Sequence, residues 1–166
     1  DKIYSGNFSL AEDIGKGIIK IFSDGMVKLI HKSGYELFDK NYEDAYLVDG
    51  KYILLLEDGK YGLFSILGKR IYNFIFDDVF QEGSFILFQK DGLIAVSNSE
   101  KIFDDGFSIN NHLNFLYIDY EYFDSGFLLL FTENEEELLD DKLNIIIPRT
   151  PQFIEFHPFG WTSKNE

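Results

Sequence analysis

The chain has no cysteine, and this absence excludes several kinds of chemistry at once. Disulfide bonds, thiolate metal sites and thiol nucleophiles all need a cysteine sulfur. The absence also fits a reducing compartment, so we expect a cytoplasmic protein, with a periplasmic or surface location and a leader upstream of Asp1 left open. With 3 prolines the chain has no proline-rich linker. It also has no run of about 18 apolar residues, the length that predicts a membrane span.

Basic residues are scarce as well. Lys and Arg number 15 against 29 Asp and Glu, which gives a formal net charge of −14. Nucleic acids and anionic membrane surfaces bind basic patches, so this balance argues against both as partners. The charge is also uneven, because the window from Ile102 to Asp141 holds 11 acidic residues and no Lys or Arg. A surface built from that window would attract a basic protein.

The sequence repeats with a period of 34 residues. Asp24-Gly25 recurs 34 positions later at Asp58-Gly59, and a third Asp-Gly follows after 33 positions at Asp91-Gly92. Tyr42-Glu43-Asp44-Ala45 likewise recurs 34 positions later as Phe76-Asp77-Asp78-Val79. Periods of about 20–50 residues indicate stacked supersecondary units, which usually present binding surfaces.

Each repeat predicts antiparallel strands joined by tight turns. Apolar runs rich in Ile, Leu, Phe and Tyr alternate with Asp-Gly pairs, which tolerate the positive φ angles of hairpin turns. In the clearest unit, 51–83, we expect strands at about 52–57, 60–66 and 69–75. The expected fold class is all-β, with about four 34-residue, three-stranded antiparallel units forming a curved meander that is propeller-like or barrel-like.

The repeats are expected to fill one domain, 1–166, with units at 17–50, 51–83, 84–107 and 126–148. The third unit is shortened at a turn, Ser97-Asn98-Ser99-Glu100, and its Phe103-Asp104-Asp105 matches Phe76-Asp77-Asp78. Proline cannot donate to a strand ladder, so Pro148 is expected to end the last strand. The C-terminal tail, 149–166, is expected to lie outside the pattern.

Two nearby stretches carry a recognisable pattern: Asp58-Gly59-Lys60-Tyr61-Gly62-Leu63-Phe64 and Phe76-Asp77-Asp78-Val79-Phe80-Gln81-Glu82-Gly83. This pattern resembles the bacterial WG-repeat (KWG-repeat) family. The family's motif is Asp-Gly-Lys-Trp-Gly, and degenerate copies of the repeat that contains it cover about 17–147. The position of the family's Trp is taken by other residues, namely Val27, Tyr61 and Ile94. The resemblance implies all-β units that act in interaction rather than catalysis, and it supplies no catalytic set.

The third copy is longer than the others by an acidic and aromatic insertion, 108–123, inside the window without bases. Insertions in repeat arrays map to one face, often the binding face. If 115–123 is a strand, alternation separates two sets of side chains. The core-like set is Leu116, Ile118, Tyr120 and Tyr122, and the opposite set is Tyr117, Asp119, Glu121 and Phe123.

Aromatic rings supply contact area and carboxylates attract a cationic partner, so the second set predicts a partner-binding face. The predicted partner-binding residues are Tyr117, Asp119, Glu121, Phe123, Asp124, Glu133, Glu135 and Glu137. The other interpretation is a solvated acidic face that keeps an aromatic-rich chain soluble and protects its edge strands.

No pattern predicts catalysis, a cofactor or a metal site. His31, His112 and His157 lie far apart and have no partner at ligand spacing. The acidic pairs lack the alternating oxygen spacing of a calcium loop, so structural or solvated roles are expected for them. These pairs are Asp77-Asp78, Asp104-Asp105 and Asp140-Asp141.

Two hypotheses of function follow. The first is a non-enzymatic binding module, a bacterial immunity or inhibitor protein that docks its acidic face on a basic toxin or nuclease domain. The second is a surface or periplasmic adhesion module, part of a longer chain, that binds carbohydrate or protein through exposed Tyr and Phe. Neither hypothesis includes nucleic-acid binding or membrane insertion.

Overall fold

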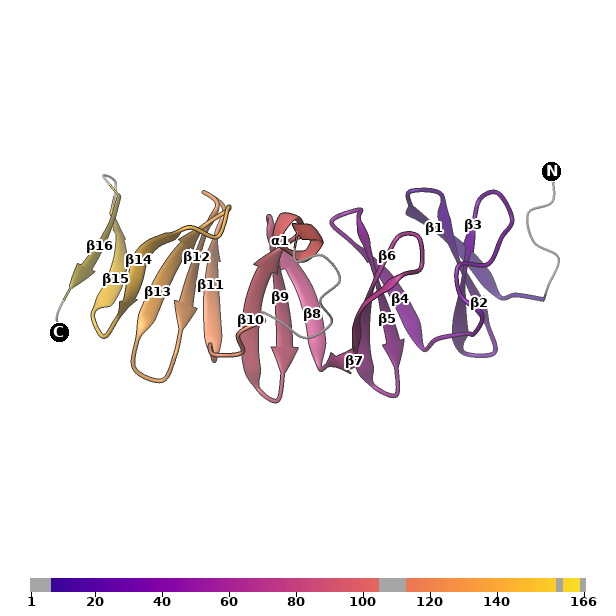
Figure 1. Ribbon diagram of the computed structural model, residues 1–166, viewed down its shortest axis with the longest axis horizontal. Helices are drawn as coiled ribbons and strands as arrows, with labels where there is room; N and C mark the ends of the chain where they lie inside the picture. Colours follow the sequence, from indigo (N-terminus) through magenta and orange to yellow (C-terminus); the bar gives the residue numbers. More distant parts are fainter. Residues whose placement is uncertain (1–6, 105–112, 158–159, 165–166) are drawn as a thin grey trace. The chain divides into compact units, whose positions relative to one another are not determined.

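The computed structural model describes residues 7–104, 113–157 and 160–164, and these residues confirm the all-β fold (Figure 1). The elements are β1 (Leu10–Gly15), β2 (Ile18–Ser23), β3 (Met26–His31), β4 (Asp44–Val48), β5 (Tyr52–Glu57), β6 (Lys60–Ser65), β7 (Arg70–Phe76), β8 (Asp78–Glu82), β9 (Phe85–Lys90), β10 (Leu93–Asn98), α1 (Ser99–Asp104), β11 (Asp119–Phe123), β12 (Phe127–Phe131), β13 (Glu136–Asp140), β14 (Ile145–Thr150), β15 (Phe153–His157) and β16 (Gly160–Lys164). In the part described, no helix has the length and apolar character needed to cross a membrane.

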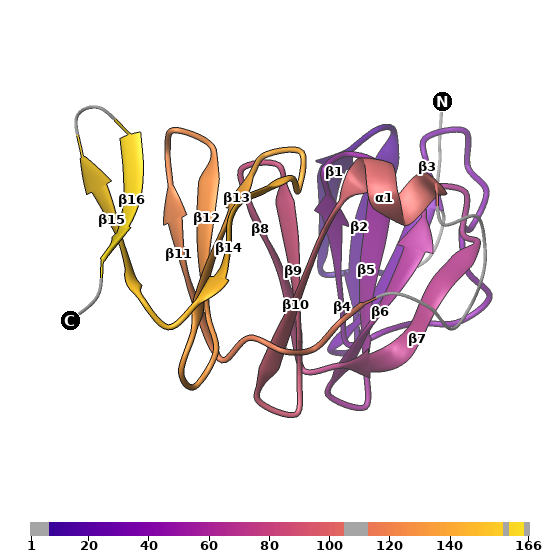
Figure 2. The ribbon, with the colours of Figure 1, turned by 60° about the vertical axis from the view of Figure 1, so that its left-hand side comes forward.

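The chain divides into two compact units, Asp1–Asp78 and Val79–Glu166. The first unit contains the sheets β1-β2-β3 and β4-β5-β6-β7. The second contains the sheet β8-β9-β10, the sheet β11-β12-β13-β14 and the hairpin β15-β16. Every pair of neighbouring strands is antiparallel, and each sheet keeps the order of the sequence, as Figures 1 and 2 show.

The Asp-Gly turns form as the sequence predicts. Asp24, Asp58 and Asp91 have φ angles of 53°, 51° and 52°, and the glycine after each of them is also positive. Two consecutive positive φ angles give the hairpin turn whose twist matches that of its strands. Accordingly, the strands expected at 52–57, 60–66 and 69–75 are β5, β6 and β7 within one residue.

The register of the sheets confirms the repeat. In three copies of the repeat, the residue two positions after the glycine of the Asp-Gly turn pairs with an aromatic residue in the last, edge segment of its sheet. These pairs are Val27 with Tyr42, Tyr61 with Phe76, and Ile94 with Tyr117. The repeating unit is therefore three strands plus an edge segment, and an aromatic side chain marks the edge.

This register places the extra chain of the third copy before Tyr117 rather than after it. Tyr117 is the counterpart of Phe76, whereas Phe103 and Asp104 lie in α1. The segment 119–123 is β11, the regular first strand of the next sheet, and not part of an insertion. Asp105 and 108–112, which belong to the expected match and the expected insertion, lie outside the described residues.

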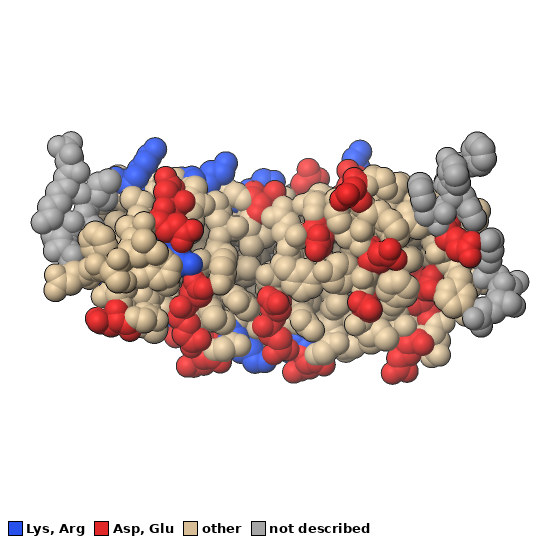
Figure 3. Space-filling model, turned by 180° about the vertical axis from the view of Figure 1, so that it is seen from behind, with Lys and Arg blue, Asp and Glu red and all other residues tan. Residues whose placement is uncertain are grey.

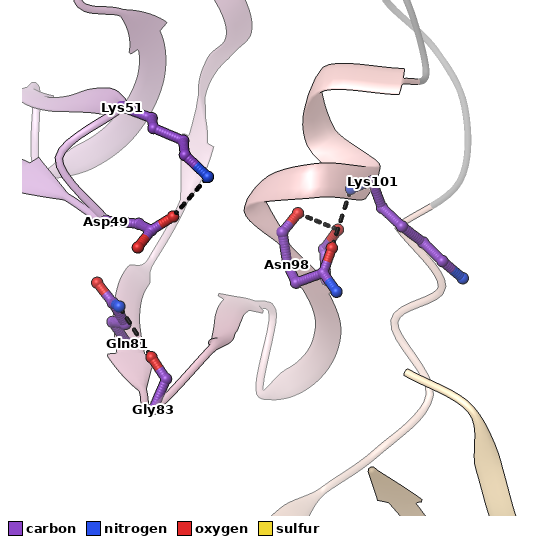
Figure 4. A network of polar contacts seen from close by, with 7 residues as sticks. Asp49, Lys51, Gln81, Gly83, Asn98 and Lys101 are labelled. Carbon is purple, nitrogen blue, oxygen red and sulfur yellow. Dashed lines mark hydrogen bonds and ion pairs between the residues drawn. The ribbon is translucent and has the colours of Figure 1, made fainter. Parts of the chain in front are cut away.

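The residues expected to form a turn, Ser97 to Glu100, instead join a strand to a helix. β10 continues to Asn98, and α1 begins at Ser99. The Asn98 side chain caps the helix, because its Oδ1 accepts a hydrogen bond of 2.9 Å from the backbone N–H of Lys101 (Figure 4). The same view shows the turn between β8 and β9, where the Gln81 amide donates to the carbonyl of Gly83.

The C-terminal residues also differ from the expectation. β14 continues through Pro148 to Thr150, because an edge strand with an irregular ladder has positions where no N–H is needed. Residues 149–166, expected to lie outside the repeats, hold the hairpin β15-β16.

Each unit has its own core. In the first, side chains of β2 and β3 pack against those of β4 and β5, including Ile18, Val27, Ile53 and Leu55. In the second, one cluster joins the sheet β8-β9-β10 to β11-β12-β13, and another lies under the hairpin β15-β16. The two faces of the β11-β12-β13-β14 sheet are thus both covered near its middle, which leaves its edges and turns as surface.

Candidate partner-binding surface

The predicted partner-binding residues lie on the β11-β12-β13-β14 sheet, on its turns, or at Tyr117 just before it. They do not form one patch. Asp119 and Glu121 lie on the edge strand β11, Asp124 lies at the turn to β12, and Glu133 and Glu135 lie at the opposite turn, between β12 and β13. The other three residues, Tyr117, Phe123 and Glu137, are packed inside the second unit.

Asp119 and Glu121 are exposed and share the face of β11 that the alternation predicts. The Oδ1 atom of Asp119 accepts a hydrogen bond of 2.8 Å from the N–H of Tyr120, which fixes the direction of the carboxylate. On the opposite face, Tyr120 and Tyr122 pack into the core, as expected.

Phe123 belongs to the core under the hairpin rather than to a free surface. Its ring lies 4.6 Å from the ring of Trp161 in an edge-to-face arrangement, and Phe127 contacts the same indole at 5.7 Å. Such aromatic pairs contribute about 0.5–1.5 kcal/mol each beyond the area that they bury. Phe123 therefore anchors β15-β16 to the sheet.

Tyr117 does not share the face of Asp119, because the chain crosses between sheets at this point. Tyr117 pairs with Ile94, at the edge of the preceding sheet, while β11 begins at Asp119 and pairs with β12. Ile118, at the crossing, is 48% exposed instead of buried as the alternation predicts. That prediction assumed a single strand over 115–123. In the structure, Tyr117 pairs with Ile94 of the preceding sheet, whereas the residues from Asp119 onward pair with β12.

Glu137 is buried, at 6% exposure, and its carboxylate accepts a hydrogen bond from the Tyr117 hydroxyl. Burial, and then this hydrogen bond, raise the pKa of Tyr117 above its ordinary value. A buried carboxylate needs such a donor to offset the loss of water. These two predicted site residues therefore stabilise the second unit.

A pocket of about 320 Å³ lies at the turn between β12 and β13. Glu133 and Glu135 line it, together with residues that the sequence did not single out: Phe131, Thr132, Asn134, Glu136, Thr150, Pro151, Gln152 and Phe153. Phe153 is 51% exposed at its rim. No pattern in the sequence predicts this pocket, because the pocket depends on the unexpected strand β15.

Asp140, in one of the acidic pairs, has a structural role. Asp140 accepts hydrogen bonds from the Asn144 side chain and from the N–H groups of Asn144 and Lys142, and these bonds hold its pKa below the ordinary value. Its role in the turn is the structural one expected. Within the described ranges, no three His, Asp or Glu side chains gather in a way that would hold a metal ion.

Four exposed acids of the second unit carry charges that no ion pair neutralises. Among the residues described, Asp119, Glu121, Asp124 and Glu133 form no ion pair with a Lys or Arg. By contrast, carboxylates of the first unit such as Asp44, Glu36 and Glu57 pair with lysines of that unit. Figure 3 shows acidic side chains interspersed with uncharged ones across the visible surface. Unpaired, solvent-facing carboxylates keep their negative potential and attract cations.

No protein-family model matches the sequence, and no curated protein sequence matches it. Solved structures with a similar arrangement include Hsv2 of Kluyveromyces lactis, with 10% identity, a TM-score of 0.44, and 91% of this chain covering 56% of that chain. Hsv2 of Kluyveromyces marxianus has 10% identity and a TM-score of 0.41, with coverage of 89% and 55%. A segment of HIRA has 10% identity and a TM-score of 0.36, with coverage of 86% and 57%. The chain thus spans about half the length of these structures, and the likeness carries no argument about what it binds.

Proposed function

We propose that this chain is a protein-binding module that docks acidic residues of its second unit on a basic protein surface. The observation that carries the proposal is the set of exposed carboxylates without ion pairs among the described residues, Asp119, Glu121, Asp124 and Glu133. Carboxylates of this kind accelerate encounter with a cationic partner and select against anionic ones.

The specific form that we propose is a bacterial immunity or inhibitor protein that covers the nucleic-acid-binding cleft of a toxin. Such a cleft carries Lys and Arg to contact phosphates, so an acidic protein surface is its electrostatic complement. The net charge of −14 and the window without bases support this form, as does the resemblance to the bacterial WG-repeat family.

The salt dependence of binding tests the electrostatic part of the proposal. The affinity for a basic partner is expected to fall by about tenfold or more when the ionic strength rises from about 0.05 M to 0.5 M, since exposed charges are screened over that range. Isothermal titration calorimetry at several salt concentrations measures it. An affinity that does not change with salt contradicts acidic docking.

A second candidate function, carbohydrate adhesion, is favoured by the pocket at the turn between β12 and β13. Its volume of about 320 Å³ and its mixture of Phe153 with the polar groups of Asn134 and Gln152 suit a sugar ring, which stacks on aromatics and binds polar edges. A glycan array tests it. Binding of a glycan that the substitution Phe153→Ala abolishes supports adhesion, and an array without any binding removes it.

A further inference from the structure

The pocket at the turn between β12 and β13 has walls that are held in place by hydrogen bonds. On one side, the Thr132 hydroxyl accepts bonds from the N–H groups of Asn134 and Glu135, at 3.4 and 3.0 Å, and donates one of 3.1 Å to the carbonyl of Glu135. The N–H of Thr132 donates to the same carbonyl at 2.8 Å. These bonds close the turn on itself and fix the backbone that forms this wall of the pocket.

The opposite wall is the connection between β14 and β15. The N–H of Gln152 donates to the Thr150 hydroxyl at 3.2 Å. The carboxylate of Glu136 joins the two walls, because its Oε2 accepts a hydrogen bond of 2.8 Å from the N–H of Ile154, and Glu136 also pairs with Thr150 in the sheet. The pocket is therefore preformed, which is usual for sites that bind small molecules.

An aromatic ring lies at the rim of this pocket. Phe153 is 51% exposed. The other aromatic residues of this region pack into the core under the hairpin β15-β16, namely Phe123, Phe127, Phe131 and Trp161. A half-exposed ring beside a preformed pocket gives a flat apolar surface on which a sugar ring can stack.

The polar lining of the pocket is rich in hydrogen-bond acceptors. Glu133, Glu135 and Glu136 line it, and an ionised carboxylate only accepts hydrogen bonds. The residues around the pocket, all of them in the described part of the chain, include no Lys or Arg, and the amides of Asn134 and Gln152 are donors without charge. A ligand that brings donors, above all a positively charged one, fits this lining, whereas an anionic ligand does not.

We propose that the pocket binds an amino sugar, a hexose that carries a free amino group. The inference rests on carbohydrate binding, the second candidate function above, and names the class of sugar. The protonated amine donates a charge-assisted hydrogen bond to a carboxylate, the hydroxyl groups donate to the other acceptors, and the ring stacks on Phe153. The preformed pocket and the exposed ring mark the site, and the carboxylates decide which sugar it takes.

Three methyl glycosides that differ at one position test the inference, with the full chain at a pH of about 6, where an amine of this kind is protonated. Methyl β-glucosaminide, methyl β-glucoside and methyl N-acetyl-β-glucosaminide carry an ammonium, a hydroxyl or an acetamide group at the second carbon. Titration followed by nuclear magnetic resonance of the backbone amides is expected to give the glucosaminide a dissociation constant about tenfold lower than the other two. Equal dissociation constants overturn the inference and leave carbohydrate binding intact.

Methyl β-glucuronide, which carries a carboxylate on the same ring, is the fourth ligand. It is expected not to bind, because its charge would meet carboxylates of the same sign. If it binds as tightly as the glucosaminide, the inference is wrong. If none of the four sugars binds, the inference is also overturned, and the glycan array then decides the candidate function by itself.

A pair of matched variants separates binding in the pocket from attraction to negative charge elsewhere on the chain. Glu133→Gln with Glu135→Gln is expected to raise the dissociation constant of the glucosaminide about tenfold and that of the glucoside about twofold or less. Asp119→Asn with Glu121→Gln removes the same charge outside the pocket and is expected to change neither dissociation constant. Equal losses from the two pairs would show that the amine is not bound in the pocket.

The aromatic contact has its own control. Phe153→Ala is expected to weaken the binding of the glucosaminide and the glucoside by the same factor, about tenfold or more, because stacking does not depend on the amine. Phe8→Ala removes a phenylalanine of the first unit that is equally exposed, at 50%, and is expected to have no effect. Unchanged binding of both sugars to Phe153→Ala contradicts the proposed site.

Discussion

At the scale of single residues, Lys20 and Asp44 make stability depend on pH. Burial alone raises the pKa of Asp44, but the Lys20 ammonium, the Tyr46 hydroxyl and the Ala45 N–H together bring it below its ordinary value of 3.8. Because the pKa in the folded chain is then lower than in the unfolded chain, the stabilisation is present above a pH of about 4. It is lost as the pH falls through the folded-state pKa.

Lys20→Met is therefore expected to lower the free energy of unfolding at neutral pH by about 1–3 kcal/mol, since it removes a charged hydrogen bond from a largely buried site. It should also flatten the loss of stability on acidification below a pH of about 4. Urea unfolding of the native chain and the variant over a series of pH values measures both effects. A variant whose acid limb parallels that of the native chain would show that the pair makes no such contribution.

Gly83 gives a second prediction at this scale. It lies between β8 and β9 with φ of +56°, and a Cβ atom there would come within 2.5 Å of the Tyr122 hydroxyl. Gly92 has φ of +80° with nothing within 4 Å, so alanine there brings only backbone strain. Both substitutions to alanine are expected to cost about 1 kcal/mol for the left-handed backbone, and Gly83→Ala about 1 kcal/mol more for displacing Tyr122. Equal midpoints of thermal unfolding for the two variants would contradict this.

At the scale of the elements, the contact between Tyr117 and Glu137 joins the edge of the β8-β9-β10 sheet to β13. Tyr117→Phe leaves a buried carboxylate without this donor and is expected to destabilise the chain by about 1–3 kcal/mol. Adding Glu137→Leu removes the orphaned group and should restore most of that loss. Chemical denaturation of the single and double variants measures it, and a double variant less stable than Tyr117→Phe would refute the pairing.

Local rules predict most elements of this fold, because a strand between two Asp-Gly turns carries its own signals. β5 and β6 are examples, with apolar runs bounded by Asp58-Gly59. These rules do not predict where the third copy ends and the next begins. Asp104-Asp105 imitates the acidic pair of Asp77-Asp78, while the true counterpart, Tyr117-Ile118-Asp119, has an isoleucine in place of the first acid.

The candidate site was predictable only in part for the same reason. Alternation places Asp119 and Glu121 on one exposed face as soon as β11 is recognised. The buried positions of Tyr117 and Glu137 could not be predicted in this way, because they depend on which sheet each residue pairs with. Such pairing is set by contacts between residues far apart in the sequence. The pocket with Phe153 depends on a hairpin whose sequence has no Asp-Gly turn.

At the scale of the whole molecule, the net charge of −14 is less informative than its distribution. Carboxylates of the first unit, such as Asp44 and Glu36, are neutralised by lysines of the same unit. Those at Asp119, Glu121, Asp124 and Glu133 have no such ion pair within the described ranges. This one-sided arrangement is the basis for proposing a cationic partner.

The most direct test is to measure the binding of a basic partner, identified from the native organism, to two charge-reversed variants. Asp119→Lys with Glu121→Lys is expected to abolish binding, because like charges then meet at the edge of β11. Asp124→Lys with Glu133→Lys changes the net charge equally and is expected to weaken binding without abolishing it. If the first variant binds the partner as tightly as the native chain does, the edge of β11 is not the binding surface and the account is wrong.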